Sequence, residues 1–168
     1  MSNDDLMTEL AQRAGRLLSD HKLLLVTAES CTGGALAEVI TRIPGSSGWF
    51  ERGYVAYAND AKREALGVSG ATLEHYGAVS EETAQAMAEG ALDRSHAQMS
   101  VAITGIAGPE GGTPDRPVGT VCIAWAGKGQ ATRTVRTIFH GDRLQVRRQS
   151  CLLALQGLIE MVESKSEM

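Results

Sequence analysis

The chain has 168 residues, of which 43% are apolar, 21% are charged and 4% are aromatic. This composition is typical of a globular protein in water, and it leaves few aromatic side chains for stacking on nucleic-acid bases. The formal net charge of -4 argues against binding along a phosphate backbone, which needs a clustered basic face. A small anionic ligand held by local arginines is still possible.

Targeting and redox features are sparse. No run of residues approaches the roughly eighteen apolar positions that span a bilayer, and Asn3, Asp4 and Asp5 stand where a secretory leader would be basic. We therefore expect a cytoplasmic protein without membrane contact. The cysteines lack CxxC spacing, which indicates neither a disulfide framework nor a zinc site. They are Cys31, Cys122 and Cys151.

The first half of the chain predicts alternating helices and strands. Apolar residues recur at three- and four-residue steps over residues 6–18, which is the period of an amphipathic helix. The apolar run 23–26 predicts a strand that is buried on both faces. Residues 35–40 favour a helix, which the Pro/Gly/Ser run 44–47 ends, and residues 49–57 predict a second strand.

The next segment predicts a helix, a strand and a loop. Ser80 is a good N-cap for a helix that extends to about residue 94, and two glutamates follow it where the helix dipole favours them. Alternating apolar residues over 99–103 predict a strand. The strand runs into a glycine-rich loop at residues 105–112.

The last segment predicts a β-hairpin and a closing helix. Residues 120–125 and 132–139 favour strands, and their short glycine-containing connection makes them antiparallel. Residues 144–162 predict a long helix, followed by a polar, frayed tail at 164–168. We therefore expect one α/β domain over residues 1–168, a three-layer α/β/α sandwich with a mixed, partly antiparallel sheet.

A serine- and glycine-rich segment follows the first predicted strand. The backbone N–H groups of Thr32, Gly33 and Gly34 can point at a developing oxyanion there, which makes Ser30 a candidate nucleophile. The alternative is a tight turn in which Ser30 is only an N-cap. Cys31 competes as nucleophile, although a small buried cysteine is the commoner role for such a residue.

A serine nucleophile needs a base. Among the histidines only His140, with Asp142 nearby, approaches a candidate loop. Tyr57 and Lys62 flank the passage from the second predicted strand into a helix, which can turn both toward one pocket and allows a Ser-Lys pair with Ser30. The alternative is that Lys62 is a solvated lysine on the first turns of a helix.

Two further segments have features of a ligand site. Thr104 and Gly105 begin the glycine-rich loop, whose backbone donors can meet a phosphate or a ribose, whereas a plain connection is the alternative. Arg143 and Arg147 lie at the start of the last predicted helix, where a guanidinium can bind a phosphate in bidentate fashion. A surface-charged helix start is the alternative there.

Several motifs are distributed over nearly the whole chain. They are AESCTGG at 28–34, GSS followed by WF at 45–50, YANDAK at 57–62, GAVS at 77–80, TGIAGP with PVGT within 104–120, and GDR at 141–143. Together they resemble the CinA carboxy-terminal-domain family of nicotinamide-nucleotide amidases. Within that family the chain resembles the stand-alone form, because its predicted elements begin directly with the helix before the amidase strand.

The resemblance implies a serine amidohydrolase that removes the amide nitrogen of nicotinamide mononucleotide without a metal or cofactor. It makes Ser30 the nucleophile, Lys62 the base and Tyr57 an assisting hydroxyl. The expected substrate contacts are Thr32, Gly33, Gly34, Asn59, Thr104, Gly105 and Arg143, the last as phosphate ligand with Arg147 as the alternative. A homodimer or higher assembly is expected, and nucleic acid is not an expected partner. The alternative function is a non-catalytic nucleotide-binding module, and a Ser30/His140/Asp142 hydrolase is a third.

Overall fold

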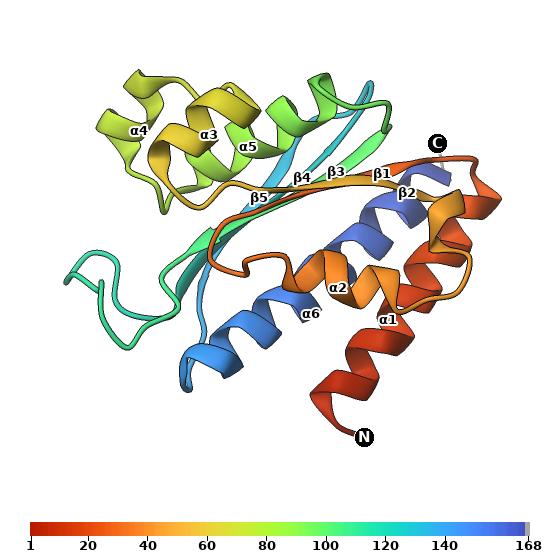
Figure 1. The fold of residues 1–168 in the computed structure, drawn as a ribbon, viewed down its shortest axis with the longest axis horizontal. Helices are drawn as coiled ribbons and strands as arrows, with labels where there is room; N and C mark the ends of the chain where they lie inside the picture. The colour runs from red at the N-terminus through yellow and green to blue at the C-terminus, as the bar shows by residue number, and fades with distance from the viewer. Residues whose placement is uncertain (167–168) are drawn as a thin grey trace.

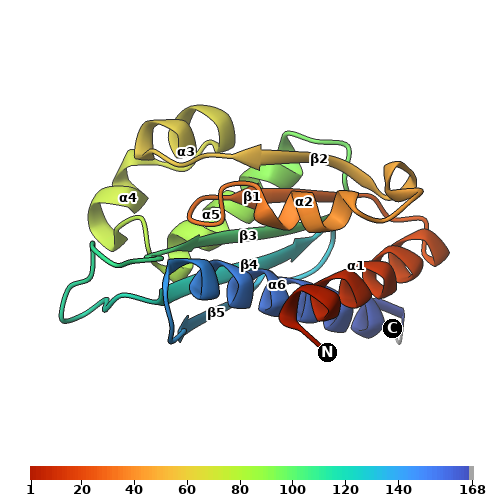
Figure 2. The same ribbon diagram turned by 60° about the horizontal axis from the view of Figure 1, so that its bottom comes forward.

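The computed structural model describes residues 1–166, with a central sheet between two layers of helices (Figures 1 and 2). The five strands have the spatial order β2-β1-β3-β4-β5. β1 pairs in parallel with β2 and β3, whereas β4 is antiparallel to β3 and to β5. The expected mixed α/β/α sandwich is therefore confirmed. The strands are β1 (Leu25–Glu29), β2 (Phe50–Val55), β3 (Met99–Gly105), β4 (Thr120–Gly127) and β5 (Arg133–Ile138).

Helices cover both faces of the sheet (Figure 1). One face carries α1 (Asn3–Asp20), α2 (Ala35–Thr41) and α6 (Arg143–Ser166), and the other carries α3 (Asn59–Leu66), α4 (Gly70–Tyr76) and α5 (Glu81–Asp93). Each face has its own apolar core. β1 and β4 are buried at every position, because both are central strands with helices on each side.

Two parts of the chain differ from the sequence-based expectation. Helix α4 has no predicted counterpart, because it is short and buries only Leu73, so it lacks an apolar stripe; its N-cap is Ser69. At the other end, α6 continues through Ser166, so residues 164–166 of the expected tail are helical, and 167–168 lie outside the described residues. Within residues 1–166, no helix combines the length and the apolar character that crossing a bilayer requires.

The parallel pairing brings distant parts of the sequence to one edge of the sheet. Because β1, β2 and β3 run in the same direction, their carboxyl ends meet at the same side. Ser30, Tyr57 and Thr104 lie at or just beyond these ends. Ligands of open α/β sheets bind outside the carboxyl ends of parallel strands. This edge is therefore where we look for a functional site.

Candidate active site

A pocket of about 280 Å³ opens at the edge of the sheet where β1, β2 and β3 end. Many residues that the sequence predicts for the site line this pocket. They are Ser30, Tyr57, Asn59, Lys62, Thr104, Gly105 and Arg143. The fold thus assembles segments that lie more than a hundred positions apart in the sequence. Thr32, Gly33 and Gly34, which were expected to contact substrate, are not among the lining residues.

Ser30 lies in a tight turn between β1 and α2. Its N–H donates to the carbonyl of Ile103 at 2.9 Å, which ties the turn to β3, and its carbonyl accepts from the N–H of Gly33 at 3.0 Å. Gly33 and Gly34 have φ angles of +58° and +99°, a region that glycine adopts without strain. The two glycines therefore shape the turn, and the N–H of Gly33 is already bonded within it.

The residues after Ser30 divide between the pocket and the core. The side chain of Thr32 is fully buried, and its hydroxyl donates to Oε1 of Glu29 at 2.6 Å, so this side chain does not reach the pocket. Within residues 1–166, the backbone N–H groups of Cys31 and Thr32 have no oxygen acceptor at hydrogen-bond distance. The N–H of Cys31 also faces its own Sγ, which is a weak acceptor. Two donors directly after a serine, neither bonded to oxygen, are the arrangement that an oxyanion requires.

Lys62 is buried, with 2% of its surface exposed. Its Nζ donates to the backbone carbonyl of Tyr57 at 2.9 Å, and among the described residues it has no ion pair with a carboxylate. Burial lowers the pKa of Lys62 from its usual value, and this effect outweighs the nearby Cys31, which acts in the opposite direction. The reading of Lys62 as a solvated surface lysine therefore does not hold.

Arg143 spans the pocket between two loops. Its Nη1 donates to the carbonyl of Gly108 at 2.7 Å, and its Nη2 donates to the hydroxyl of Tyr57 at 3.0 Å. Tyr57 is largely exposed, with 59% of the residue's surface accessible. The guanidinium is therefore held at the pocket mouth by one contact from each side, with further N–H donors available for a ligand.

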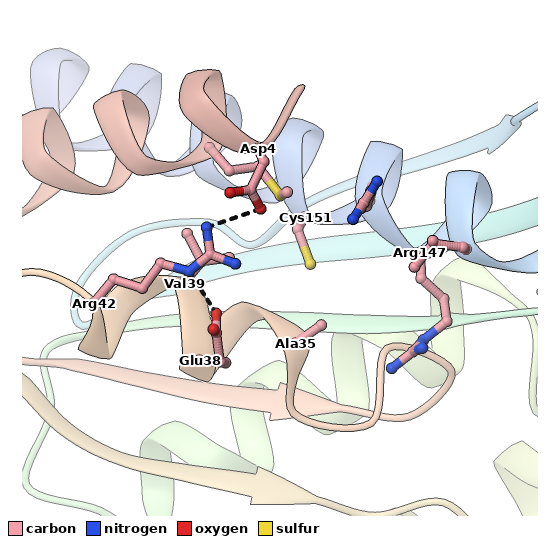
Figure 3. Close-up of a pocket in the computed structure, with 10 residues that line it drawn as sticks. Asp4, Ala35, Glu38, Val39, Arg42, Arg147 and Cys151 are labelled. Carbon is pink, nitrogen blue, oxygen red and sulfur yellow. Dashed lines mark hydrogen bonds and ion pairs between the residues drawn. The ribbon is translucent and has the colours of Figure 1, made fainter. Parts of the chain in front are cut away.

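Arg147, the alternative phosphate ligand, lies elsewhere. Its Nη2 donates to the backbone carbonyl of Thr32 at 2.9 Å, and the residue lines a second pocket of about 200 Å³ between α1, α2 and α6. Figure 3 shows this second pocket, with Arg147 on one side and, on the other, Arg42 joined to Asp4 and Glu38. Arg143 is thus the arginine that faces the pocket of Ser30.

Thr104 and Gly105 form the end of β3 at the back of the pocket. The Thr104 hydroxyl is buried and donates to the carbonyl of Ala78 at 2.8 Å. A Cβ at Gly105 would lie 2.8 Å from Cγ2 of Val121 and 2.9 Å from the carbonyl oxygen of Thr120. Glycine is therefore required for the close approach of β4 to this position.

The other candidate nucleophile and base are less suited to the reaction, although Cys31 also lines the pocket. Burial raises the pKa of Cys31 to about 12, so its thiol is protonated near neutral pH and is a poor nucleophile. His140 and Asp142 do not line the pocket. The carbonyl of His140 accepts from Gln149 and the carboxylate of Asp142 accepts from the N–H of Gln145, so the structure does not assemble them with Ser30.

One wall of the pocket was not assigned a role from the sequence. Ala78 and Val79 line it, and Arg116 fixes their turn by donating to the carbonyls of Val79 at 2.6 Å and Tyr76 at 2.5 Å. The GAVS motif at 77–80 marks this turn in the sequence, although nothing in its residue types indicates a function. Within residues 1–166, no group of three or more His, Cys, Asp and Glu side chains is placed to hold a metal ion.

Comparisons with known proteins agree on one family. The family model described as the CinA C-terminal domain matches residues 7–162. A protein of Pseudomonas putida named nicotinamide-nucleotide amidohydrolase PncC is 50% identical over 157 residues, which cover 94% of this chain and 98% of the relative. The protein of the same name from Escherichia coli K12 is 49% identical, covering 94% of this chain and 95% of the relative.

A solved structure extends the agreement to the fold. The crystal structure of the competence/damage inducible protein CihA from Agrobacterium tumefaciens has a TM-score of 0.91 to this chain and is 43% identical to it. The similarity covers 93% of this chain and 95% of the other. Sequence and fold thus agree along nearly the same length.

Proposed function

The chain belongs to the family of CinA C-terminal domains, and from that premise we propose that it hydrolyses the carboxamide of nicotinamide mononucleotide to nicotinate mononucleotide and ammonia. It is an amidohydrolase, given its identity of about half to proteins of that name over nearly the whole chain. The finer proposal adds the substrate and a Ser/Lys mechanism. The observation that carries the mechanism is the buried Lys62, whose pKa is lowered, in the same pocket as Ser30.

In the first half of the proposed reaction, neutral Lys62 accepts the hydroxyl proton of Ser30. The serine oxygen then forms a bond to the carboxamide carbon, and the N–H groups of Cys31 and Thr32 stabilise the resulting oxyanion. The C–N bond breaks as the nitrogen receives a proton from Lys62, either directly or through the hydroxyl of Tyr57. Ammonia leaves, and an ester between Ser30 and the nicotinoyl group remains.

In the second half, water replaces the amine. The oxygen of the water attacks the ester carbon while Lys62 accepts one of the water's protons. The bond between the acyl carbon and the Ser30 oxygen then breaks. The proton returns to the serine oxygen, which restores the enzyme. The balance is one water consumed and one ammonia released per carboxylate formed, and no oxidant, metal or cofactor takes part.

The two charged groups of the substrate have different effects in the pocket. Arg143 is placed to bind the phosphate, because its guanidinium lies at the mouth with donors to spare. The pyridinium ring is cationic, so it disfavours a second cation nearby and supports a neutral Lys62. We propose that this reaction takes place in the cytoplasm and that the enzyme is a homo-oligomer without a nucleic-acid partner.

A non-catalytic nucleotide-binding module is the alternative that an experiment must separate. The purified protein is incubated with a serine-directed fluorophosphonate or with nicotinamide mononucleotide, quenched in acid and digested for mass spectrometry. The proposal predicts a mass increase on the peptide that contains Ser30, which is absent from Ser30→Ala. Tight nucleotide binding with no adduct and no product would support the binding module instead.

A further inference from the structure

Glu29, the residue directly before Ser30, has no role in the mechanism above, yet it is completely buried. It is the last residue of β1, and it does not line the pocket. A buried carboxylate without partners is costly, so its contacts indicate what it does.

Both oxygens of Glu29 accept hydrogen bonds from the segment that follows Ser30. Oε1 accepts from the hydroxyl of Thr32 at 2.6 Å and from the N–H of Leu36 at 2.9 Å, and Oε2 accepts from the N–H of Ala37 at 3.0 Å. A carboxylate only accepts, so it can satisfy three donors at once, whereas an amide in its place would turn an NH₂ group toward one of them. Glu29 thus ties the end of β1 to the start of α2 across the turn.

The same turn is held from two other directions. Arg147 of α6 donates to the carbonyl of Thr32 at 2.9 Å, and it approaches from the side of the second pocket (Figure 3). The N–H of Ser30 donates to the carbonyl of Ile103 in β3. The backbone on both sides of the nucleophile is therefore fixed, while the Ser30 hydroxyl itself has no hydrogen-bond partner among the described residues.

We propose that Glu29 is a positioning residue that acts through Thr32 to hold the Ser30 hydroxyl and the N–H groups of Cys31 and Thr32 in the reactive arrangement. This inference rests on the proposed function. Thr32 links Glu29 to the reaction site, because its hydroxyl is bonded to Glu29 and its backbone N–H is one of the two donors to the oxyanion. A nucleophile displaced by about 1 Å loses on the order of a hundredfold in rate, so loosening the turn lowers the rate of Ser30 acylation and leaves substrate binding by Arg143 intact.

The test compares Thr32→Val, Thr32→Ser and Glu29→Gln with the parent protein. Thr32→Val removes only the hydroxyl at nearly constant volume, so we expect kcat to fall about tenfold to a hundredfold with KM unchanged. Thr32→Ser keeps the hydroxyl and restores most of the rate. We expect kcat of Glu29→Gln to fall at least as far as that of Thr32→Val. If Glu29→Gln does not fold, the comparison of Thr32→Val with Thr32→Ser tests the proposal. Reaction of Ser30 with a fluorophosphonate is measured in parallel and should slow by the same factor.

Ile159→Val controls for lost stability. Ile159 is buried in the C-terminal half of α6, and its truncation should lower Tm without changing kcat per folded molecule. If Thr32→Val and folded Glu29→Gln behave like this control, with lower Tm but parental kcat and labelling, the positioning role is refuted and only a structural one remains. A parent protein that neither labels at Ser30 nor releases ammonia would refute the proposed function itself, which is a different outcome.

Discussion

The Nζ atom of Lys62 donates a hydrogen bond to the backbone carbonyl of Tyr57 at 2.9 Å, inside the pocket that Ser30 also lines. This contact fixes the amine without pairing it with a negative charge. A carboxylate partner would favour the ammonium form, whereas a carbonyl in a buried site leaves the lowered pKa in place. The arrangement suits a base that works as a neutral amine.

We expect Ser30→Ala to abolish ammonia release and Cys31→Ala to retain most of it. Both side chains line the pocket, but burial raises the pKa of Cys31 to about 12, so its thiol stays protonated near neutral pH. The measurement is steady-state ammonia release, with circular dichroism to confirm that both variants fold. A dead Cys31→Ala beside a normally active Ser30→Ala would reverse the assignment.

The activity should rise with pH as Lys62 loses its proton. Because burial lowers the pKa of Lys62, the inflection of kcat/KM should lie below about 10.4, the value of a free lysine. In Lys62→Met, kcat/KM should fall on the order of a hundredfold to ten-thousandfold, which is the usual contribution of a general base. This variant should show no such inflection. An inflection that persists unchanged in Lys62→Met would assign it to another group.

The same residue predicts how stability depends on pH. The folded pKa of Lys62 is lowered, so between that pKa and about 10.4 the unfolded chain binds more protons and the free energy of unfolding rises with pH. Lys62→Met lacks this contribution. Its stability advantage over the parent should be largest below the folded pKa and shrink as pH rises. Urea unfolding of both proteins from pH 6 to 10 measures this difference; a constant difference would contradict a lowered pKa.

Arg143→Ala should weaken binding of the mononucleotide more than its chemistry. Loss of one charge-assisted contact costs about 1.5 to 3 kcal/mol, so kcat/KM should fall roughly tenfold to a hundredfold or more. Nicotinamide riboside, which lacks the phosphate, should be a poor substrate for the parent. Its kcat/KM should change little in Arg143→Ala. Arg148→Ala is the matched control, because it removes an arginine of the same helix that does not line the pocket of Ser30, and it should leave kcat/KM at the parental value. Equal losses on both substrates would remove Arg143 from the phosphate site.

Chelation should leave the rate unchanged. Within the described residues, no group of three or more His, Cys, Asp and Glu side chains is placed to hold a metal ion, and the proposed steps use Ser30, Lys62, the Tyr57 hydroxyl and the backbone. The measurement is ammonia release before and after dialysis against EDTA. A loss that one divalent metal restores would require a different mechanism.

Much of the site follows from sequence because its residues sit where strands end. Thr104 directly follows the alternating run 99–103, and Ser30 follows shortly after the apolar run 23–26. Both runs predict strands, and parallel strands place their carboxyl ends together. The position of Lys62 is harder to derive. A lysine in the first turns of a helix is usually solvated, and only the packing of α3 buries this one.

Other features depend on contacts that no local pattern encodes. Arg143 and Arg147 are one helical turn apart and chemically identical, but one faces the pocket and the other reaches the back of the Ser30 turn. Thr32 sits in the motif of the nucleophile, yet its side chain points into the core because the buried Glu29 accepts its hydroxyl. Helix α4 is not predicted from the sequence, because a short helix with one buried side chain has no repeating apolar pattern.

The most direct test of the central claim is to incubate the purified protein with nicotinamide mononucleotide and measure ammonia and nucleotide products together. The account predicts ammonia and nicotinate mononucleotide in equal amounts from the parent and neither from Ser30→Ala. Release of free nicotinamide instead would show cleavage at the ribose rather than at the amide. That result, or no turnover by a folded protein, would contradict the proposed reaction.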